Sequence, residues 1–368
     1  MNKKKVGIIF GGKSAEHEVS LQSAKNIVDA IDRTAYDVVL IGIDKQGKWH
    51  INEESSYLLH AENPKLIELN KSNNPVGLIP GDAGGELIHA ESATSLGQLD
   101  VVFPIVHGTL GEDGSLQGMM RLANLPFVGT DVLGSALCMD KDIAKKLLKL
   151  ANIQVAKGLT FRRAQMDSID FSRVAEELGT PMFIKPANQG SSVGVSKVST
   201  KEEFDKAIRE AFDFDHKLII EEAIVGREIE CSILGNEEPI ASLPGEILPQ
   251  TEFYSYDSKY IDEKGAELEI PADLPEETTK RIQEIAIKAF QTLECEGLAR
   301  VDVFLTEAGD IYVNEINTLP GFTTISMYPK LWEVSGISYS ELINRLIELA
   351  IDRHEQDQLL KSSVWDEE

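Results

Sequence analysis

Three runs of consecutive apolar residues, each followed by glycine or polar residues, mark the first third of the chain. They are residues 6–10 (VGIIF), 38–43 (VVLIGI) and 99–106 (LDVVFPIV). Continuous apolar runs are typical of strands that are buried on both faces of a parallel sheet. Between the first two runs, residues 21–31 have the periodicity of an amphipathic helix. This pattern predicts a β-α-β opening and a doubly wound parallel sheet.

The remaining two thirds alternate between helical and strand patterns. Apolar spacing predicts helices at residues 116–123, 133–150, 201–211, 275–293 and 339–352. Apolar runs at 182–186 and from residue 217 predict strands, and the mixed, polar segment 52–98 is expected to be peripheral. Residues 245–268 are aromatic and polar without a clear period, which is typical of a lid loop over an active site.

Residues 297–305 and 311–321 are rich in β-branched and aromatic residues and flank a polar turn, so they predict a β-hairpin. With a four-residue loop at 307–310, Asp302 faces Glu315 and Arg300 faces Asn317. Paired side chains lie about 4.5–5.5 Å apart, where two carboxylates repel. The hairpin therefore predicts a bound cation, and its oxygen donors favour Mg²⁺ over zinc. The alternative is a solvated edge hairpin whose acidic residues bind nothing.

Polar residues follow two of the N-terminal strands, where ligands bind in doubly wound sheets. Glu16 comes just after the first strand and could bind a substrate ammonium, or it could simply favour the dipole of the next helix. His107 begins a glycine-rich turn after the strand at 99–106, and it is either a polar ligand contact or a structural histidine. The glycines do not form G-x-G-x-x-G, so a nicotinamide site is not indicated.

A lysine inside an apolar strand, Lys185, precedes a Gly/Ser loop that contains Ser191 and Ser192. Such a loop offers backbone N–H and hydroxyl donors to phosphate, and a strand lysine can reach the same oxygens. The motif is not a Walker A loop, because its lysine precedes the glycines. Lys141 is a second candidate cation, or an ordinary solvated charge.

Acidic residues follow the apolar strand that begins at residue 217. Glu221, Glu222 and Glu228 could accept hydrogen bonds from adenine and ribose, or they could be ordinary acids at a strand end.

The composition limits the classes of molecule that the protein is expected to bind. Arginine and lysine number 36 against 61 acidic residues, for a formal charge of −25, and this argues against nucleic acid and anionic membranes. An anionic substrate would need a local cluster of cations. The first apolar run is too short for a signal peptide, and no run reaches the ~18 residues of a membrane helix. Three scattered cysteines suggest a reducing compartment. We expect a cytoplasmic protein of two or three domains.

Seven motifs are recognisable in order: residues 11–20 (GGKSAEHEVS), 107–114 (HGTLGEDG), 139–141 (MDK), 185–194 (KPANQGSSVG), 256–260 (YDSKY), 300–302 (RVD) and 314–321 (NEINTLPG). With them the chain resembles the D-alanine–D-alanine ligase family of the ATP-grasp superfamily over nearly its whole length. The resemblance implies an α/β, three-domain ATP-grasp architecture, α+β in the ATP-grasp part. Its expected parts are a Rossmann-like substrate domain (1–129), a central lid domain (130–224) and a catalytic domain (225–368), with ATP held between two antiparallel sheets.

The resemblance also implies roles for individual residues. Two Mg²⁺ ions, or Mn²⁺, are expected on Asp302, Glu315 and Asn317. ATP is expected to contact Lys141, Lys185, Ser192, Glu221, Glu222, Ala223 and Glu228. Glu16, supported by His107, would bind the ammonium of the first D-alanine, and Lys259, Ser326 and Met327 would bind the second D-alanine. Arg300 and the Gly321 N–H would stabilise an oxyanion, and Ser191, Tyr260 and Glu16 would link the closed lid to the substrates.

The implied reaction is ATP-dependent ligation of two D-alanines through an acyl phosphate, for peptidoglycan precursors, by an enzyme expected to form a homodimer. One alternative is a sibling ligase that makes another D-alanyl peptide or the D-alanyl-D-lactate ester. Tyr260 favours the amide, since the ester-forming relatives usually lack tyrosine there. The other alternative is a silent ATP-binding regulator, and the presence of Arg300, Asp302, Glu315 and Asn317 argues against it.

Overall fold

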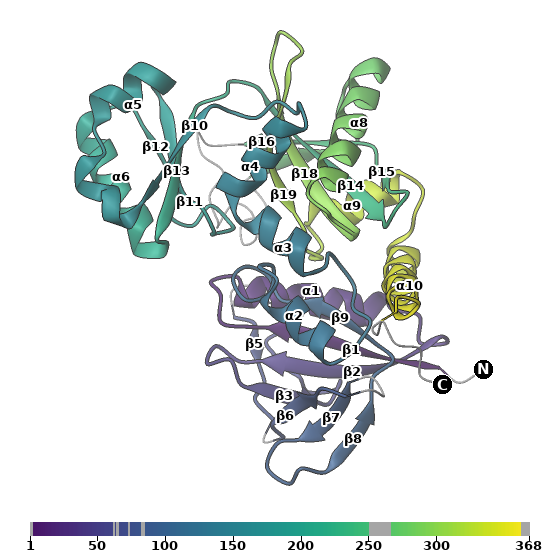
Figure 1. Ribbon diagram of the computed structural model, residues 1–368. Coiled ribbons are helices and arrows are strands. Elements are labelled where there is room, and N and C mark those ends of the chain that lie inside the picture. Colours follow the sequence, from purple (N-terminus) through teal and green to yellow (C-terminus); the bar gives the residue numbers. More distant parts are fainter. Residues whose placement is uncertain are drawn as a thin grey trace.

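The computed structural model describes residues 3–61, 63, 66–72, 74–81, 85–249 and 266–361. They form an N-terminal lobe, a small central lobe and a C-terminal lobe, seen at the bottom, upper left and upper right of Figure 1. In the N-terminal sheet β1 lies between β2 and β9 and runs parallel to both, and β3 pairs antiparallel with β2 at the edge. Its elements are β1 (Lys4–Gly11), α1 (His17–Ala30), β2 (Tyr36–Ile43), β3 (Trp49–Asn52), β9 (Val101–Ile105) and α2 (Ser115–Leu122). The predicted parallel sheet is confirmed.

The segment predicted to be peripheral forms small sheets at the outer side of this lobe (Figure 1). They contain β4 (Leu58–Leu59), β5 (Glu68–Leu69), β6 (Val76–Ile79), β7 (Glu86–His89) and β8 (Ser95–Gln98). The last three strands form an antiparallel meander.

The central lobe is a four-stranded antiparallel sheet in the order β10-β13-β11-β12. Its elements are β10 (Gly158–Arg162), the short 3-10 helix η1 (Arg163–Ser168), α5 (Phe171–Leu178), β11 (Met182–Pro186), β12 (Ser196–Val198), α6 (Lys201–Phe214) and β13 (Lys217–Glu222). Phe204 and Phe212 of α6 are buried on this sheet together with Ile184 and Ile220.

The C-terminal lobe is a second antiparallel sheet, in the order β17-β16-β14-β18-β19, with β15 paired to β14. Its strands are β14 (Arg227–Gly235), β15 (Ile240–Ala241), β16 (Gly245–Pro249), β17 (Ala266–Glu269), β18 (Gly297–Leu305) and β19 (Ile311–Asn317). Its helices, with those that lead to it, are α3 (Val132–Met139), α4 (Lys141–Leu150), α8 (Glu276–Thr292), α9 (Met327–Val334) and α10 (Tyr339–Gln358). No helix in the described ranges is long and apolar enough to cross a membrane.

Two details differ from the prediction. The helix predicted over 133–150 is two helices, because Asp140 has extended backbone and its side chain accepts a hydrogen bond from the Ile143 N–H (3.1 Å), which caps α4. The segment 245–268, predicted as a loop, begins with β16 and ends with β17, and residues 250–265 lie outside the described part.

The predicted hairpin is confirmed, and its pairing has an unexpected cause. Asp302 is paired with Glu315 and Arg300 with Asn317, as predicted. The loop between β18 and β19 has five residues (306–310) instead of four, which by itself would shift the pairing by one. A β-bulge between Asp302 and Val303 restores it, because Val303 is paired with Val313 while Asp302 is paired with Glu315. The extra residue is Asn314.

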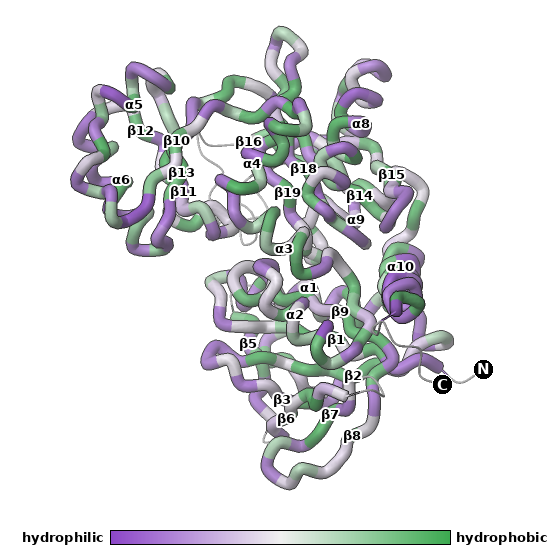
Figure 2. The backbone as a smooth tube through the Cα atoms, in the orientation of Figure 1, coloured by the Kyte–Doolittle hydropathy of each residue, from purple (hydrophilic) through white to green (hydrophobic). Residues whose placement is uncertain are grey.

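Helix α10, from the C-terminal part of the chain, packs against the N-terminal sheet. Leu342, Ile343 and Leu346 are fully buried in one cluster with Val6 and Ile8 of β1. Figure 2 shows the hydrophobic stretches that run along the strands of the N-terminal sheet.

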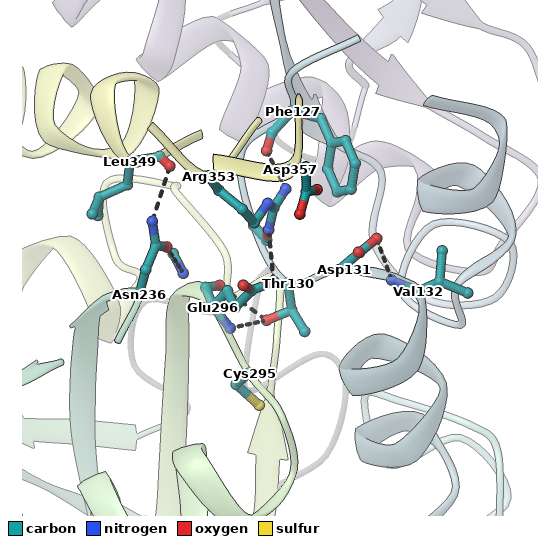
Figure 3. Close-up of polar contacts among 12 residues, drawn as sticks. Phe127, Thr130, Asp131, Val132, Asn236, Cys295, Glu296, Leu349, Arg353 and Asp357 are labelled. Carbon is teal, nitrogen blue, oxygen red and sulfur yellow. Dashed lines mark hydrogen bonds and ion pairs between the residues drawn. The ribbon is translucent and has the colours of Figure 1, made fainter. Parts of the chain in front are cut away.

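The buried Arg353 of the same helix lies against the connection between the N-terminal lobe and α3 (Figure 3). Its guanidinium donates to the carbonyls of Gly129 and Phe127, forms an ion pair with Glu296 (3.2 Å), and lies over the Phe127 ring.

Candidate active site

The carboxyl ends of β1 and β9 meet where the strand order reverses, which is the ligand-binding edge of such sheets. Glu16 and His107 both lie at this edge, and both are buried. The Oγ of Ser191, from the Gly/Ser loop of the central lobe, donates a hydrogen bond to Glu16. Two glycines allow this close approach, because a Cβ at Gly108 or Gly190 would lie 2.6 or 3.1 Å from a Glu16 carboxylate oxygen.

His107 is held by both ring nitrogens. Nδ1 lies 3.0 Å from the Leu319 carbonyl and Nε2 lies 3.1 Å from the Ser23 Oγ. Burial lowers the pKa of His107 to about 4, although its bond to Leu319 acts in the opposite direction. The ring is therefore neutral at physiological pH. Since a carbonyl only accepts, Nδ1 carries the proton and Nε2 accepts from Ser23. His107 thus ties the loop after β19 to the N-terminal lobe.

A second carboxylate that the sequence analysis did not single out, Glu112, lies beside Glu16. The Gly108 N–H donates to its Oε2 at 2.6 Å. Burial, together with the charge of Glu16, raises the pKa of Glu112 well above its usual range. The site therefore contains two neighbouring carboxyl groups, and this environment favours the neutral form of Glu112 or a bound cationic ligand.

The hairpin presents its charged residues to the same region. Arg300 donates to both carboxylate oxygens of Asp302, at 2.7 Å each, and lies 3.0 Å from Glu230. Lys141 at the start of α4 is 3.7 Å from Glu315, and its Nζ donates to the Gln189 carbonyl (2.7 Å). Within the described ranges, no group of three or more His, Cys, Asp or Glu side chains could hold a metal ion by itself.

A buried cluster of two lysines around one carboxylate lies between the two antiparallel sheets. Glu221 of β13 pairs with Lys185 of β11 (2.8 Å) and with Lys145 of α4. Burial alone would raise the pKa of Glu221, but the two ammonium charges lower it to about 2. Burial lowers the pKa of Lys145 to about 8, against the opposing effect of Glu221.

The sequence analysis missed Lys145. Its spacing of four from Lys141 on one helix was the available signal, because residues four apart share a face.

Most of the predicted site residues line two adjoining cavities. The first is lined by residues that include Glu228, Arg300, Asp302, Glu315, Gly321, Ser326 and Met327. The second is lined by residues that include Glu16, His107, Lys141, Ser191, Arg300, Glu315, Asn317 and Gly321. Arg300, Glu315 and Gly321 belong to both cavities and so mark the point where two bound molecules could meet.

The other predicted residues are placed differently. Lys185 reaches the hairpin through Asn314 (3.4 Å), and Glu222 accepts a hydrogen bond from the Lys157 N–H (2.7 Å). Ser192 lies in the loop after β11 with a left-handed φ of 61°, as does Ser191 with 50°. Ala223 follows β13. Lys259 and Tyr260 lie outside the described residues.

Two family models match the chain. The D-ala D-ala ligase N-terminus matches residues 5–130, and the D-ala D-ala ligase C-terminus matches residues 147–348. The D-alanine--D-alanine ligase of Shouchella clausii is 70% identical over 100% of both chains. The D-alanine--D-alanine ligase A of Escherichia coli K12 is 58% identical and matches 99% of this chain and 100% of its own length.

Solved structures give the same result. The D-alanine-D-alanine ligase from Coxiella burnetii has a TM-score of 0.84 at 41% identity, over 98% of this chain and 97% of that chain. The VanG D-Ala:D-Ser ligase from Enterococcus faecalis has a TM-score of 0.83 at 40% identity, over 95% of this chain and 100% of that chain.

Proposed function

The chain belongs to the D-alanine–D-alanine ligase family, whose reaction is the ATP-dependent formation of D-alanyl-D-alanine for peptidoglycan synthesis, and we propose that the residues around the two cavities carry that reaction out. The observation that carries the proposal is the junction of the cavities at Arg300, Glu315 and Gly321. Two substrates bound in adjoining cavities can react with each other only where the cavities meet. Here that point contains a cation, Arg300, and a carboxylate, Glu315.

The first step activates a carboxylate, whose oxide is otherwise too poor a leaving group for an amine to displace. The ammonium of the first D-alanine binds Glu16, and its carboxylate oxygen attacks the γ-phosphate of ATP to give an acyl phosphate and ADP. Lys141 and Lys185 offset charge on the phosphates during this transfer.

The remaining nucleotide contacts are assigned by position. The loop that contains Ser192 donates hydrogen bonds to phosphate oxygens. Adenine and ribose contact Glu222, the backbone at Ala223, and Glu228. Because both oxygens of Glu221 are paired with lysines, its role is to hold Lys185 toward the phosphates.

Asp302, Glu315 and Asn317 form a set of hard oxygen donors on one hairpin, and this set fits Mg²⁺ or Mn²⁺. Two carboxylates and an amide do not fill the coordination of two ions, so the nucleotide phosphates would supply further ligands, which is common for Mg²⁺. When bound, the ions would neutralise charge on the phosphates.

In the second step the amine of the second D-alanine, held by Lys259, Ser326 and Met327, attacks the acyl carbon. This attack forms the C–N bond, and Arg300 and the Gly321 N–H hold the resulting tetrahedral oxyanion. The oxyanion then collapses, the C–O bond to phosphate breaks, and the nitrogen loses a proton as phosphate leaves. Acyl phosphates hydrolyse in water, so the lid that contains Tyr260 and the Ser191–Glu16 hydrogen bond would serve to exclude water.

We further propose a cytoplasmic homodimer. The support for the compartment is the set of three free cysteines, since Cys138, Cys231 and Cys295 form no disulfide. The support for the dimer is the family resemblance.

Phosphate release tests the proposed reaction. With ATP and Mg²⁺, we expect release only when D-alanine is present, with one phosphate per dipeptide. Release without D-alanine would indicate an uncoupled ATPase, and no release under any condition would indicate a silent regulator. A second candidate, a D-Ala:D-Ser ligase, is favoured by the likeness to VanG. Mixtures of D-alanine with D-serine or D-lactate separate the two, and we expect D-alanyl-D-alanine to predominate.

A further inference from the structure

Two cysteines far apart in the sequence contact each other beside the second cavity. Cys138 lies near the end of α3, and Cys295 lies between α8 and β18. Their sulfur atoms are 3.4 Å apart, and both thiols are free and buried. Figure 3 shows Cys295 next to Glu296, across from Thr130 in the chain segment that leads into α3.

The two segments that carry these cysteines are fixed against each other at more than one point. Thr130 Oγ1 donates to the Glu296 carbonyl (3.1 Å), and the Glu296 N–H donates to Thr130 Oγ1 (3.3 Å). Within α3, Gly134 lies so close that a Cβ there would be 2.2 Å from the Glu294 carbonyl oxygen. The sulfur contact is therefore a fixed feature of two packed segments.

Cys138 is one of the residues that line the second cavity, together with Glu16 and Lys141. Cys231 provides the contrast. Its side chain is completely buried within the C-terminal sheet, its nearest polar partner is the Ser242 carbonyl at 3.6 Å, and it lines neither of the two cavities.

We propose that Cys138 and Cys295 are a peroxide-sensitive pair, which a peroxide entering through the second cavity converts into an intramolecular disulfide. In the first step the Cys138 thiolate attacks a peroxide oxygen, the O–O bond breaks, and a sulfenic acid and one water result. The Cys295 sulfur then attacks the Cys138 sulfur, and the S–O bond breaks with release of a second water. Together the two thiols lose two electrons, and one hydrogen peroxide gains them and is reduced to two waters.

The short distance between the two sulfur atoms favours the second step, in which the disulfide forms. A disulfide bond is about 2.0 Å long, so the sulfurs need to approach by about 1.4 Å from their present contact. The first step is slow, because burial, reinforced by the neighbouring thiol, raises the pKa of Cys138 and leaves little thiolate at neutral pH. Disulfide formation should accordingly accelerate as the pH rises.

Thiol counting tests the proposal. The reduced full-length enzyme is treated with hydrogen peroxide above neutral pH, denatured, labelled with N-ethylmaleimide and weighed by mass spectrometry. We expect one label, on Cys231, and a cross-linked peptide that contains Cys138 and Cys295. Three labels after prolonged treatment, or loss of the Cys231 label first, would overturn the proposal.

Two variants and a protection experiment sharpen the test. Cys295→Ser removes the second thiol, so peroxide should leave a sulfenic acid on Cys138 that dimedone traps. Cys231→Ser is the matched control and should still form the disulfide at the wild-type rate. Saturating D-alanine with a non-hydrolysable ATP analogue should fill the cavity and slow disulfide formation several-fold. An equal rate with and without these ligands would rule out entry through the cavity.

Discussion

Asp302 and Glu315 are like charges on paired residues of one hairpin, and each lies near a cation, Arg300 on the same strand for Asp302 and Lys141 of α4 for Glu315. Arg300 binds both oxygens of Asp302, and Lys141 lies 3.7 Å from Glu315. Among the residues that line the two cavities, Lys141 and Arg300 lie close to six acidic residues, so both cations are engaged by carboxylates. Under the proposed function, a polyanionic substrate would bind here by displacing carboxylates from Lys141 and Arg300, and a metal ion would bind the released oxygens.

The first prediction follows from this exchange. Glu315→Gln keeps the size of the side chain but removes the charge that a metal ion would bind, so turnover should fall by at least about 100-fold. The thermal midpoint of unfolding should stay near that of the wild type. Glu307→Gln is the matched control, because Glu307 is an exposed acid in the loop of the same hairpin. Wild-type dipeptide synthesis by the Glu315→Gln variant at saturating Mg²⁺ would contradict the metal assignment.

The second prediction concerns pH. The folded state lowers the pKa of His107 from 6.5 to about 4, so between these values the unfolded chain binds more protons. Acidification should therefore favour unfolding, with His107 contributing about 2 kcal/mol of lost stability between about pH 7 and about pH 5. His107→Gln removes this contribution. Urea unfolding at the two pH values should show a smaller loss for the variant, and equal losses would contradict the neutral, buried state of His107.

At the scale of elements, the hairpin shows what the sequence could and could not predict. The pairing of Asp302 with Glu315 is predicted correctly from a loop that is one residue too short, because an unforeseen bulge at Asn314 compensates. A bulge depends on local twist and leaves no reliable sequence signal.

Other differences have similar causes. Apolar spacing continues across Asp140 and so predicts a single helix, whereas the cap that Asp140 forms on Ile143 starts a new one. The burial of Lys145 depends on Glu221, a partner on a distant strand.

The third prediction concerns residues 250–265, part of the segment predicted from the sequence to be a lid loop. Tyr260 belongs to residues 250–265, so its contacts remain a prediction. If its hydroxyl hydrogen-bonds to Ser191 or Glu16 when the lid closes, Tyr260→Phe should make the free energy of lid closure less favourable by about 1–3 kcal/mol. Water would then compete with the incoming amine, giving slower dipeptide formation and more than one phosphate per dipeptide, with ATP affinity little changed. A one-to-one ratio at the wild-type rate would show that the lid works differently.

For the whole molecule, Arg353 is the contact that joins the last helix to the connection between lobes. Its guanidinium donates to the carbonyls of Phe127 and Gly129 and pairs with Glu296, which directly precedes β18 of the C-terminal sheet. No sequence pattern distinguishes it from Arg345, two turns earlier on the same helix, whose partner is merely Glu341 at i−4 on the surface.

The fourth prediction compares these two arginines. Arg353→Met leaves two buried carbonyls without a donor and Glu296 without its cation, so the free energy of unfolding should fall by about 2–4 kcal/mol. Arg345→Met removes an exposed pair and should change it by less than about 0.5 kcal/mol. Urea denaturation of the full chain measures both. Equal effects would show that Arg353 does not join the lobes as described.

The position of α10 also has a consequence for biosynthesis. One face of the N-terminal sheet, which includes Ile9 and Val102, is covered by residues no later than Phe127. The other face, which includes Val6 and Ile8, is covered in part by Leu342 and Ile343. A ribosome makes the chain from its N-terminus, so α1, with Leu21 and Ile27, can cover part of this face early, while the part under α10 stays exposed until that helix has been translated. Premature termination before α10 would therefore leave that part of the face open to chaperones and proteases.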